Sequence, residues 1–171
     1  MDKEYLMLRD ELLHLDTVVN NTINFFYVFI ASFIAFALTQ EDTIFILLSY
    51  IVIIPAYLIV ISKMQGICKI GAYLSLFHEG EKFNWETRNI KFNQKHVTIF
   101  SHIVSSNFPF IFVSAAAVIL FMYRTQWDKL PQVYEECKLC SAIVLFLVVL
   151  VLAYKNRNIN TNDYIKKWED I

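Results

Sequence analysis

Glycine and proline are scarce in this chain of 171 residues, with three of each. So few glycines exclude a glycine-rich phosphate-binding loop and argue against flexible linkers between domains. The sequence also has no H-x-x-x-H metal pair and no G-x-S-x-G nucleophile motif. A net charge of −1 gives no broadly basic surface for nucleic acid. We therefore expect no cofactor, no metal site and no direct binding of nucleic acid.

Cysteine is limited to Cys68, Cys137 and Cys140. The last two form a C-x-x-C pattern, which is typical of a redox pair or of half a metal site. The alternative is that they are two small residues at the start of a helix. With no histidine or further cysteine nearby, the pattern favours the second interpretation.

What the chain has in excess is apolar sequence, at 57% of residues with a mean hydropathy of +0.46. Four apolar stretches cover residues 23–39, 44–62, 97–122 and 139–154. Each is close to the length that a helix needs to cross about 30 Å of hydrocarbon. None contains Asp or Glu, which argues against a carboxylate proton relay or a cation pump. The sequence predicts an all-α, polytopic membrane protein with four transmembrane helices in one domain, residues 1–171.

Lysine and arginine are distributed unevenly between the segments that join these stretches. Two precede the first stretch, six lie in residues 63–96 and four in residues 155–171, against none in residues 40–43 and three in residues 123–138. Because positive loops stay in the cytoplasm, both termini and the middle segment are predicted to be cytoplasmic. The cytoplasmic extensions are then residues 2–20, 63–96 and 155–171.

Two of these extensions carry apolar stripes at helical spacing. Residues 2–39 are predicted to form one helix, and the second helix is predicted to continue past residue 63. The stripes comprise Tyr5, Leu8, Leu12 and Leu15 in the first extension, and Met64, Ile67, Ile70 and Leu74 in the second. Because isolated amphipathic helices are marginal in water, we expect the two to pack together, within one chain or between copies.

Polar residues cluster where helices are expected to enter or cross the membrane. Polar groups without partners are costly in hydrocarbon, so they call for water or for neighbouring helices. The candidates for lining an aqueous path in an oligomer are Asn20, Asn24, Ser101, His102, Ser105, Ser106 and Asn107. The alternative is that these groups bond to neighbouring helices or to their own backbone. His102 is the ionisable member, and such residues at membrane depth are functional candidates.

A second candidate site is the pair Arg9 and His14, which matches the R-x(4–6)-H signature of the HEPN superfamily, many of whose members are RNases. Histidine can act as a general acid or base, and arginine can hold a phosphate. Two such motifs normally face each other across a dimer. The alternative is that both residues lie on the solvated face of an amphipathic helix.

The size of the chain, its several spans, the R-x4-H motif and the stretches 71–74 and 83–88 together resemble a known family. The chain is similar to the small membrane accessory protein of type VI-B CRISPR–Cas systems. The resemblance implies a ring-shaped homo-oligomer that forms a pore in the bacterial inner membrane. It also implies a functional link to an RNA-guided RNase in antiphage defence, with Arg9 and His14 in the HEPN-like motif.

We therefore expect a pore-forming effector that perturbs or depolarises the bacterial inner membrane, and not an enzyme. Two alternatives stay open. One is a membrane-tethered HEPN-type ribonuclease that uses Arg9 and His14. The other is a non-conducting structural or signalling subunit of a membrane complex.

Overall fold

A computed structural model describes residues 3–78, 87–88, 91, 107–125, 132–156, 159 and 161–170. Among these residues the only regular secondary structure is helix, with no strand, which confirms the all-α class for the described part of the chain. The elements are α1 (Lys3–Thr39), α2 (Ile44–Leu47), α3 (Tyr50–Tyr73), a π-helical turn η1 (Leu74–His78), α6 (Phe108–Arg124), α7 (Gln132–Asn156) and α8 (Thr161–Glu169).

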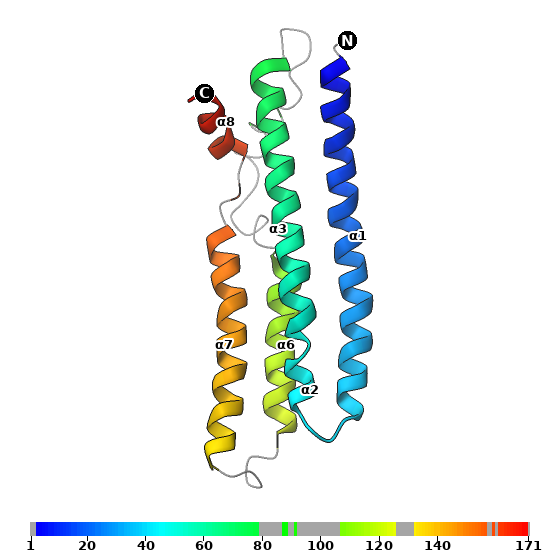
Figure 1. The fold of residues 1–171 in the computed structure, drawn as a ribbon, viewed down its shortest axis with the longest axis vertical. Coiled ribbons are helices and arrows are strands. Elements are labelled where there is room, and N and C mark those ends of the chain that lie inside the picture. The colour runs from blue at the N-terminus through cyan, green and yellow to red at the C-terminus, as the bar shows by residue number, and fades with distance from the viewer. Residues whose placement is uncertain are drawn as a thin grey trace.

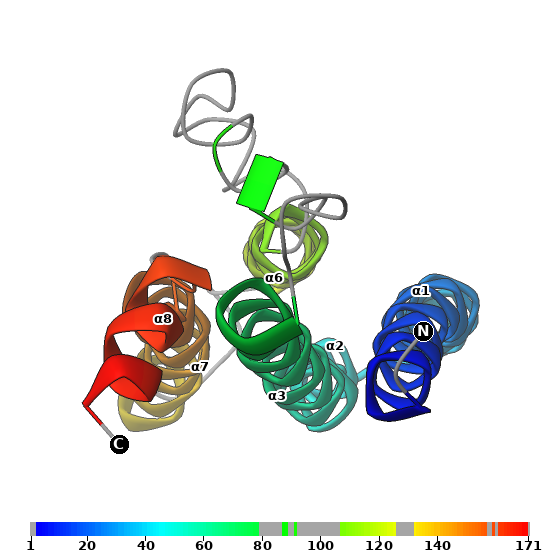
Figure 2. The ribbon, with the colours of Figure 1, turned by 90° about the horizontal axis from the view of Figure 1, so that it is seen from above.

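The long helices stand side by side as a bundle (Figure 1). Viewed along the bundle, α3 lies between α1 and α7, and α6 packs beside α3 (Figure 2). The start of α1 and the end of α8 lie at the same end of the bundle (Figure 1). This arrangement agrees with the prediction that both termini lie on one side of a membrane.

Helix α1 is a single helix of 37 residues, as the uninterrupted helical periodicity predicts. At 1.5 Å per residue it is about 55 Å long, so it must extend well beyond a hydrocarbon layer of about 30 Å. Its apolar half ends at a short turn, where the backbone N–H of Ile44 donates to Oδ1 of Asp42 at 3.0 Å. That bond satisfies a free amide at the start of the next helix, as expected for an aspartate in this position.

The charged halves of α1 and α3 pack against each other within one chain. Gly66 makes the approach possible, because a Cβ atom at that position would lie 3.2 Å from Cδ1 of Leu15. Beyond this point α3 continues into η1, which ends at His78. The two predicted extensions are therefore partners in the same subunit, together with α8, which packs on α3.

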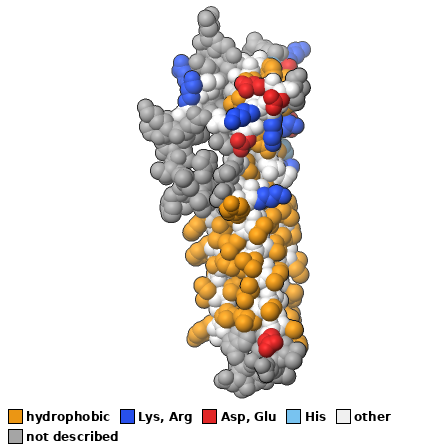
Figure 3. Space-filling model, turned by 90° about the vertical axis from the view of Figure 1, so that its left-hand side faces the viewer, with side chains coloured by type: hydrophobic (Ala, Val, Ile, Leu, Met, Phe, Trp, Pro, Cys, Tyr) orange, Lys and Arg blue, Asp and Glu red, His pale blue; other side chains and the backbone are white. Residues whose placement is uncertain are grey.

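Within the described residues, three helical segments are long and apolar enough to cross a membrane: α1, the segment Ile44–His78, and residues Glu136–Asn156 of α7. Figure 3 views the bundle from the side of α7, where apolar side chains form a broad band that gives way to charged side chains at one end. Helix α6 is apolar too, but it has only 17 residues and begins at Phe108. The helix begins at Phe108, with Asn107 as its N-cap and with Pro109 in its first turn, where proline is favoured. The first part of the predicted stretch, residues 97–106, lies outside the described residues.

The core is built around stacked aromatic rings. The Phe110 ring lies 4.6 Å from the ring of Tyr57 on α3, nearly parallel to it at 18°, and 4.6 Å from the ring of Phe26 on α1. Hydrogen bonds satisfy the hydroxyl groups of two buried tyrosines: Tyr50 donates to the backbone carbonyl of Ser114 at 2.9 Å, and Tyr57 donates to Oδ1 of Asn107 at 2.7 Å. The core therefore ties α1, α3 and α6 together.

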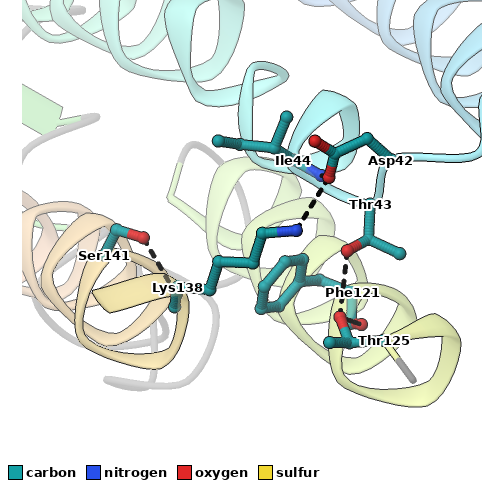
Figure 4. Close-up of polar contacts among 7 residues, drawn as sticks. All are labelled: Asp42, Thr43, Ile44, Phe121, Thr125, Lys138 and Ser141. Atoms are coloured by element: carbon teal, nitrogen blue, oxygen red, sulfur yellow. Dashed lines mark hydrogen bonds and ion pairs between the residues drawn. The ribbon is translucent and has the colours of Figure 1, made fainter. Parts of the chain in front are cut away.

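At the end of the bundle away from the termini, polar contacts join α6 and α7 to the end of α1 and to the turn that follows it. Nζ of Lys138 on α7 lies 2.8 Å from Oδ1 of Asp42, and the hydroxyl groups of Thr43 and Thr125 are 3.1 Å apart (Figure 4). Arg124 donates to the backbone carbonyl of Leu38 at 2.5 Å. Lys138 is 8% exposed, so its ammonium group depends on Asp42 for charge compensation.

Replacing Asp42 with asparagine should lower the free energy of unfolding at neutral pH by about 1 kcal/mol, because it leaves the buried Lys138 without its counter-charge. Lys138 holds the pKa of Asp42 below its usual value of 3.8. A lowered pKa adds stability that is complete above the unfolded pKa and is lost as pH falls through the folded one. Unfolding in detergent should therefore show the same loss at pH 7 and pH 5, and a smaller loss below pH 3.8.

The matched control is Glu41→Gln, which changes an exposed carboxylate in the same turn. It should leave the unfolding midpoint unchanged. A deficit of Asp42→Asn that persists in full below pH 3.8 would contradict the assignment of the ion pair as its cause.

Candidate functional site: the outer face of helix α1

Helix α1 lies at one edge of the bundle and turns most of its surface away from its own chain (Figure 2). Of the 18 consecutive residues that form the most apolar part of α1, only 17% are buried. Asn20 and Asn24, two of the predicted lining residues, lie on this outer surface and are exposed. Because α1 is one helix, their positions relative to each other follow directly from helical geometry.

The two asparagines differ in how their amide groups are satisfied. Nδ2 of Asn20 donates to Oδ2 of Asp16, one turn earlier, at 3.3 Å. The amide group of Asn24 has no hydrogen-bond partner within the part of the chain that the structure describes. Asn24 therefore needs water or a group from another molecule.

The depth of Asn24 follows from the antiparallel packing of α1 and α3. Leu15 lies opposite Gly66, and Lys63 lies one turn from Gly66 toward the apolar band. At 1.5 Å per residue along both helices, Asn24 lies about 9 Å farther than Lys63 from the charged end of the bundle, toward the middle of the apolar band. An amide at that depth lies inside the apolar band, where an unpaired polar group is costly.

The predicted polar cluster of the third apolar stretch is only partly described. Ser101, His102, Ser105 and Ser106 lie outside the described residues. Asn107 is buried, and its side-chain carbonyl accepts the hydrogen bond from Tyr57. Within the single chain, Asn107 therefore connects α6 to α3, and Asn20 and Asn24 are the predicted lining residues that face outward.

Arg9 and His14 both lie on the charged half of α1. His14 is exposed and Arg9 is half-buried. Five residues of helix separate the directions of two side chains by about 140°, so the pair does not converge on one point in a single chain. A composite site of the HEPN kind would need a second copy. In the described residues no group of three or more His, Cys, Asp or Glu side chains could hold a metal, and the three cysteines are free thiols.

A groove of about 440 Å³ between the charged halves of α1 and α3 was not predicted from the sequence. Glu4 and Glu11 line it on one side, Lys63 and Lys69 on the other, and Trp168 of α8 lies at its edge. Nε1 of Trp168 donates to the backbone carbonyl of Lys69 at 3.4 Å. The one local signal in the sequence that could have indicated the return of α8 to the bundle is the i, i+4 spacing of Tyr164 and Trp168.

The described structure thus defines an all-α chain with three helices able to cross a membrane. No protein-family model, curated protein or solved structure matches this chain. The resemblance to the CRISPR accessory protein therefore stays a prediction.

Proposed function

We propose that this chain is a subunit of a homo-oligomeric pore in the bacterial inner membrane. One observation carries the proposal: Asn24 is exposed on the outer face of a membrane-crossing helix, inside the apolar band, with no hydrogen-bond partner in the described part of its own chain. Lipid tails cannot hydrogen-bond an amide, whereas a water-filled path between subunits can. Asn20 lies one turn away on the same face and extends the polar surface.

A ring of copies suits the shape of the subunit. Helix α1 lies at the edge of the bundle, so it is free to contact other copies (Figure 2). Ala31 and Ala35 are exposed on the same side as Asn24, and small side chains let helices approach closely in a membrane. Copies inserted in the same orientation then place their α1 helices side by side around an axis.

We propose that α6 is the fourth span. Its 17 residues give about 26 Å of helix, close to the hydrocarbon thickness of about 30 Å once slight thinning is allowed. Arg124 marks its end, where it donates to the backbone carbonyl of Leu38 on α1. An even number of spans agrees with the shared end of the N- and C-termini and with the predicted cytoplasmic location of both (Figure 1).

The family resemblance supports a role for the pore in antiphage defence. In that role it depolarises the membrane once an RNA-guided RNase has recognised foreign RNA. The chain itself then needs no cofactor and no contact with nucleic acid. Its contribution is a conducting path through the membrane.

Potassium flux from vesicles of phosphatidylethanolamine and phosphatidylglycerol tests this proposal. Asn24→Leu should lower the flux of the reconstituted protein by about tenfold, because each copy loses a hydrated amide worth at least about 1.4 kcal/mol at that depth. Asn24→Gln keeps an amide and should retain most of the flux.

The matched control is Ser32→Leu, since Ser32 is exposed on another face of α1 and its hydroxyl already donates to the backbone carbonyl of Val28 at 2.9 Å. It should conduct as the wild type does. A wild-type protein that releases no potassium, or an Asn24→Leu variant with undiminished flux, would overturn the assigned function or the assigned lining, respectively.

A further inference from the structure

Leu6 and Leu13 are exposed on the charged half of α1, with exposed fractions of 43% and 52%. At 100° per residue, these two leucines lie within about 40° of Asn20 and Asn24 around the helix axis. Because α1 is continuous from Lys3 to Thr39, any face of it that turns toward a pore axis at Asn24 also does so at Leu13 and Leu6.

In the single chain these two apolar side chains are exposed beyond the apolar band of the bundle. By the same count along the helix, Leu13 lies about 8 Å and Leu6 about 18 Å on the water side of Lys63. Lipid tails do not reach that far, and burying each leucine would contribute about 25 cal/mol for every Å² removed from water. Their spacing of seven residues is that of a coiled-coil seam between parallel helices.

The charges beside this line of leucines favour contact between copies in a ring. Around the axis of α1, Arg9 lies about 50° to one side of the line through Leu6 and Leu13, and Asp10 lies about 50° to the other side. In a closed ring each subunit presents one flank to the opposite flank of its neighbour. Arg9 of one copy is then beside Asp10 of the next, an arrangement of opposite charges that flanks the apolar seam.

We propose that Leu6 and Leu13 of successive copies surround the axis at the charged end and form the apolar constriction of the pore, with Arg9 beside Asp10 of the adjacent copy. This inference rests on the proposed function. A narrow apolar ring resists wetting and therefore sets the rate of ion flow, whereas the asparagines deeper in the membrane stay hydrated. Arg9 then has a role in assembly that does not depend on catalysis.

Potassium flux from the same vesicles tests the constriction. Leu13→Asn, alone and with Leu6→Asn, should raise the flux about tenfold, because polar side chains let water fill the narrowest section. The control is Met7→Asn, which changes a side chain that is 68% exposed but lies about 100° from the line of leucines. It should leave the flux at the wild-type level.

A charge exchange tests the contact between neighbours independently of flux. Arg9→Glu should lower the oligomer mass in detergent, and Arg9→Glu with Asp10→Arg should restore it. If the wild type conducts but Leu13→Asn does not exceed it, the constriction is elsewhere and the pore proposal stands. If neither the wild type nor any variant conducts, the proposed function fails as well.

Discussion

Replacing Phe110 with alanine should lower the free energy of unfolding by about 3–5 kcal/mol. The side chain is fully buried and stacks on Tyr57 while it also contacts Phe26, so it is the point where α6, α3 and α1 meet. Its removal leaves a cavity that three long helices cannot readily fill. Chemical unfolding in mixed micelles, followed by far-ultraviolet circular dichroism, measures the loss.

Phe112→Ala is the control for this change, because Phe112 lies on the same helix but is 60% exposed. It should lower the free energy of unfolding by less than about 1 kcal/mol. Equal losses for the two variants would contradict the aromatic core as described.

Replacing Gly66 with leucine should separate the charged halves of α1 and α3 and cost about 2–3 kcal/mol. Even a single Cβ atom at this position would lie 3.2 Å from Leu15, so the branched side chain has no space. Spin labels at Leu8 and Tyr73, on opposite sides of the groove, should report a longer distance in this variant.

The double variant Gly66→Leu with Leu15→Ala provides the matched test, since it removes the side chain that meets residue 66. It should recover most of the lost stability and bring the labels back together. If Gly66→Leu leaves both the distance and the stability unchanged, α1 and α3 do not pack at this point.

The long elements could be predicted because each depends on local sequence. An unbroken periodic pattern predicted the whole of α1. Hydropathy alone did not mark the start of α6 at Phe108, because it continues through residues 97–107. The signal for this start is Asn107 followed by Pro109, a cap and a first-turn proline.

The contacts that hold the bundle together could not be predicted in the same way. The Tyr57–Asn107 bond joins residues 50 positions apart, and the Asp42–Lys138 pair joins residues 96 positions apart. No local pattern marks either pair, because both depend on how whole helices pack. Of the candidate site, the outward position of Asn20 and Asn24 on one helix was predictable, whereas the internal role of Asn107 required the packing of α6 against α3.

The central claim is that copies of this chain assemble through the outer face of α1 into a closed ring. Native mass spectrometry of the wild-type protein in lipid nanodiscs measures this directly. We expect one dominant species whose mass is a fixed multiple of the 20.1 kDa chain, and a shift to smaller species for Arg9→Glu. A wild-type protein that appears only as a single chain under these conditions would contradict it.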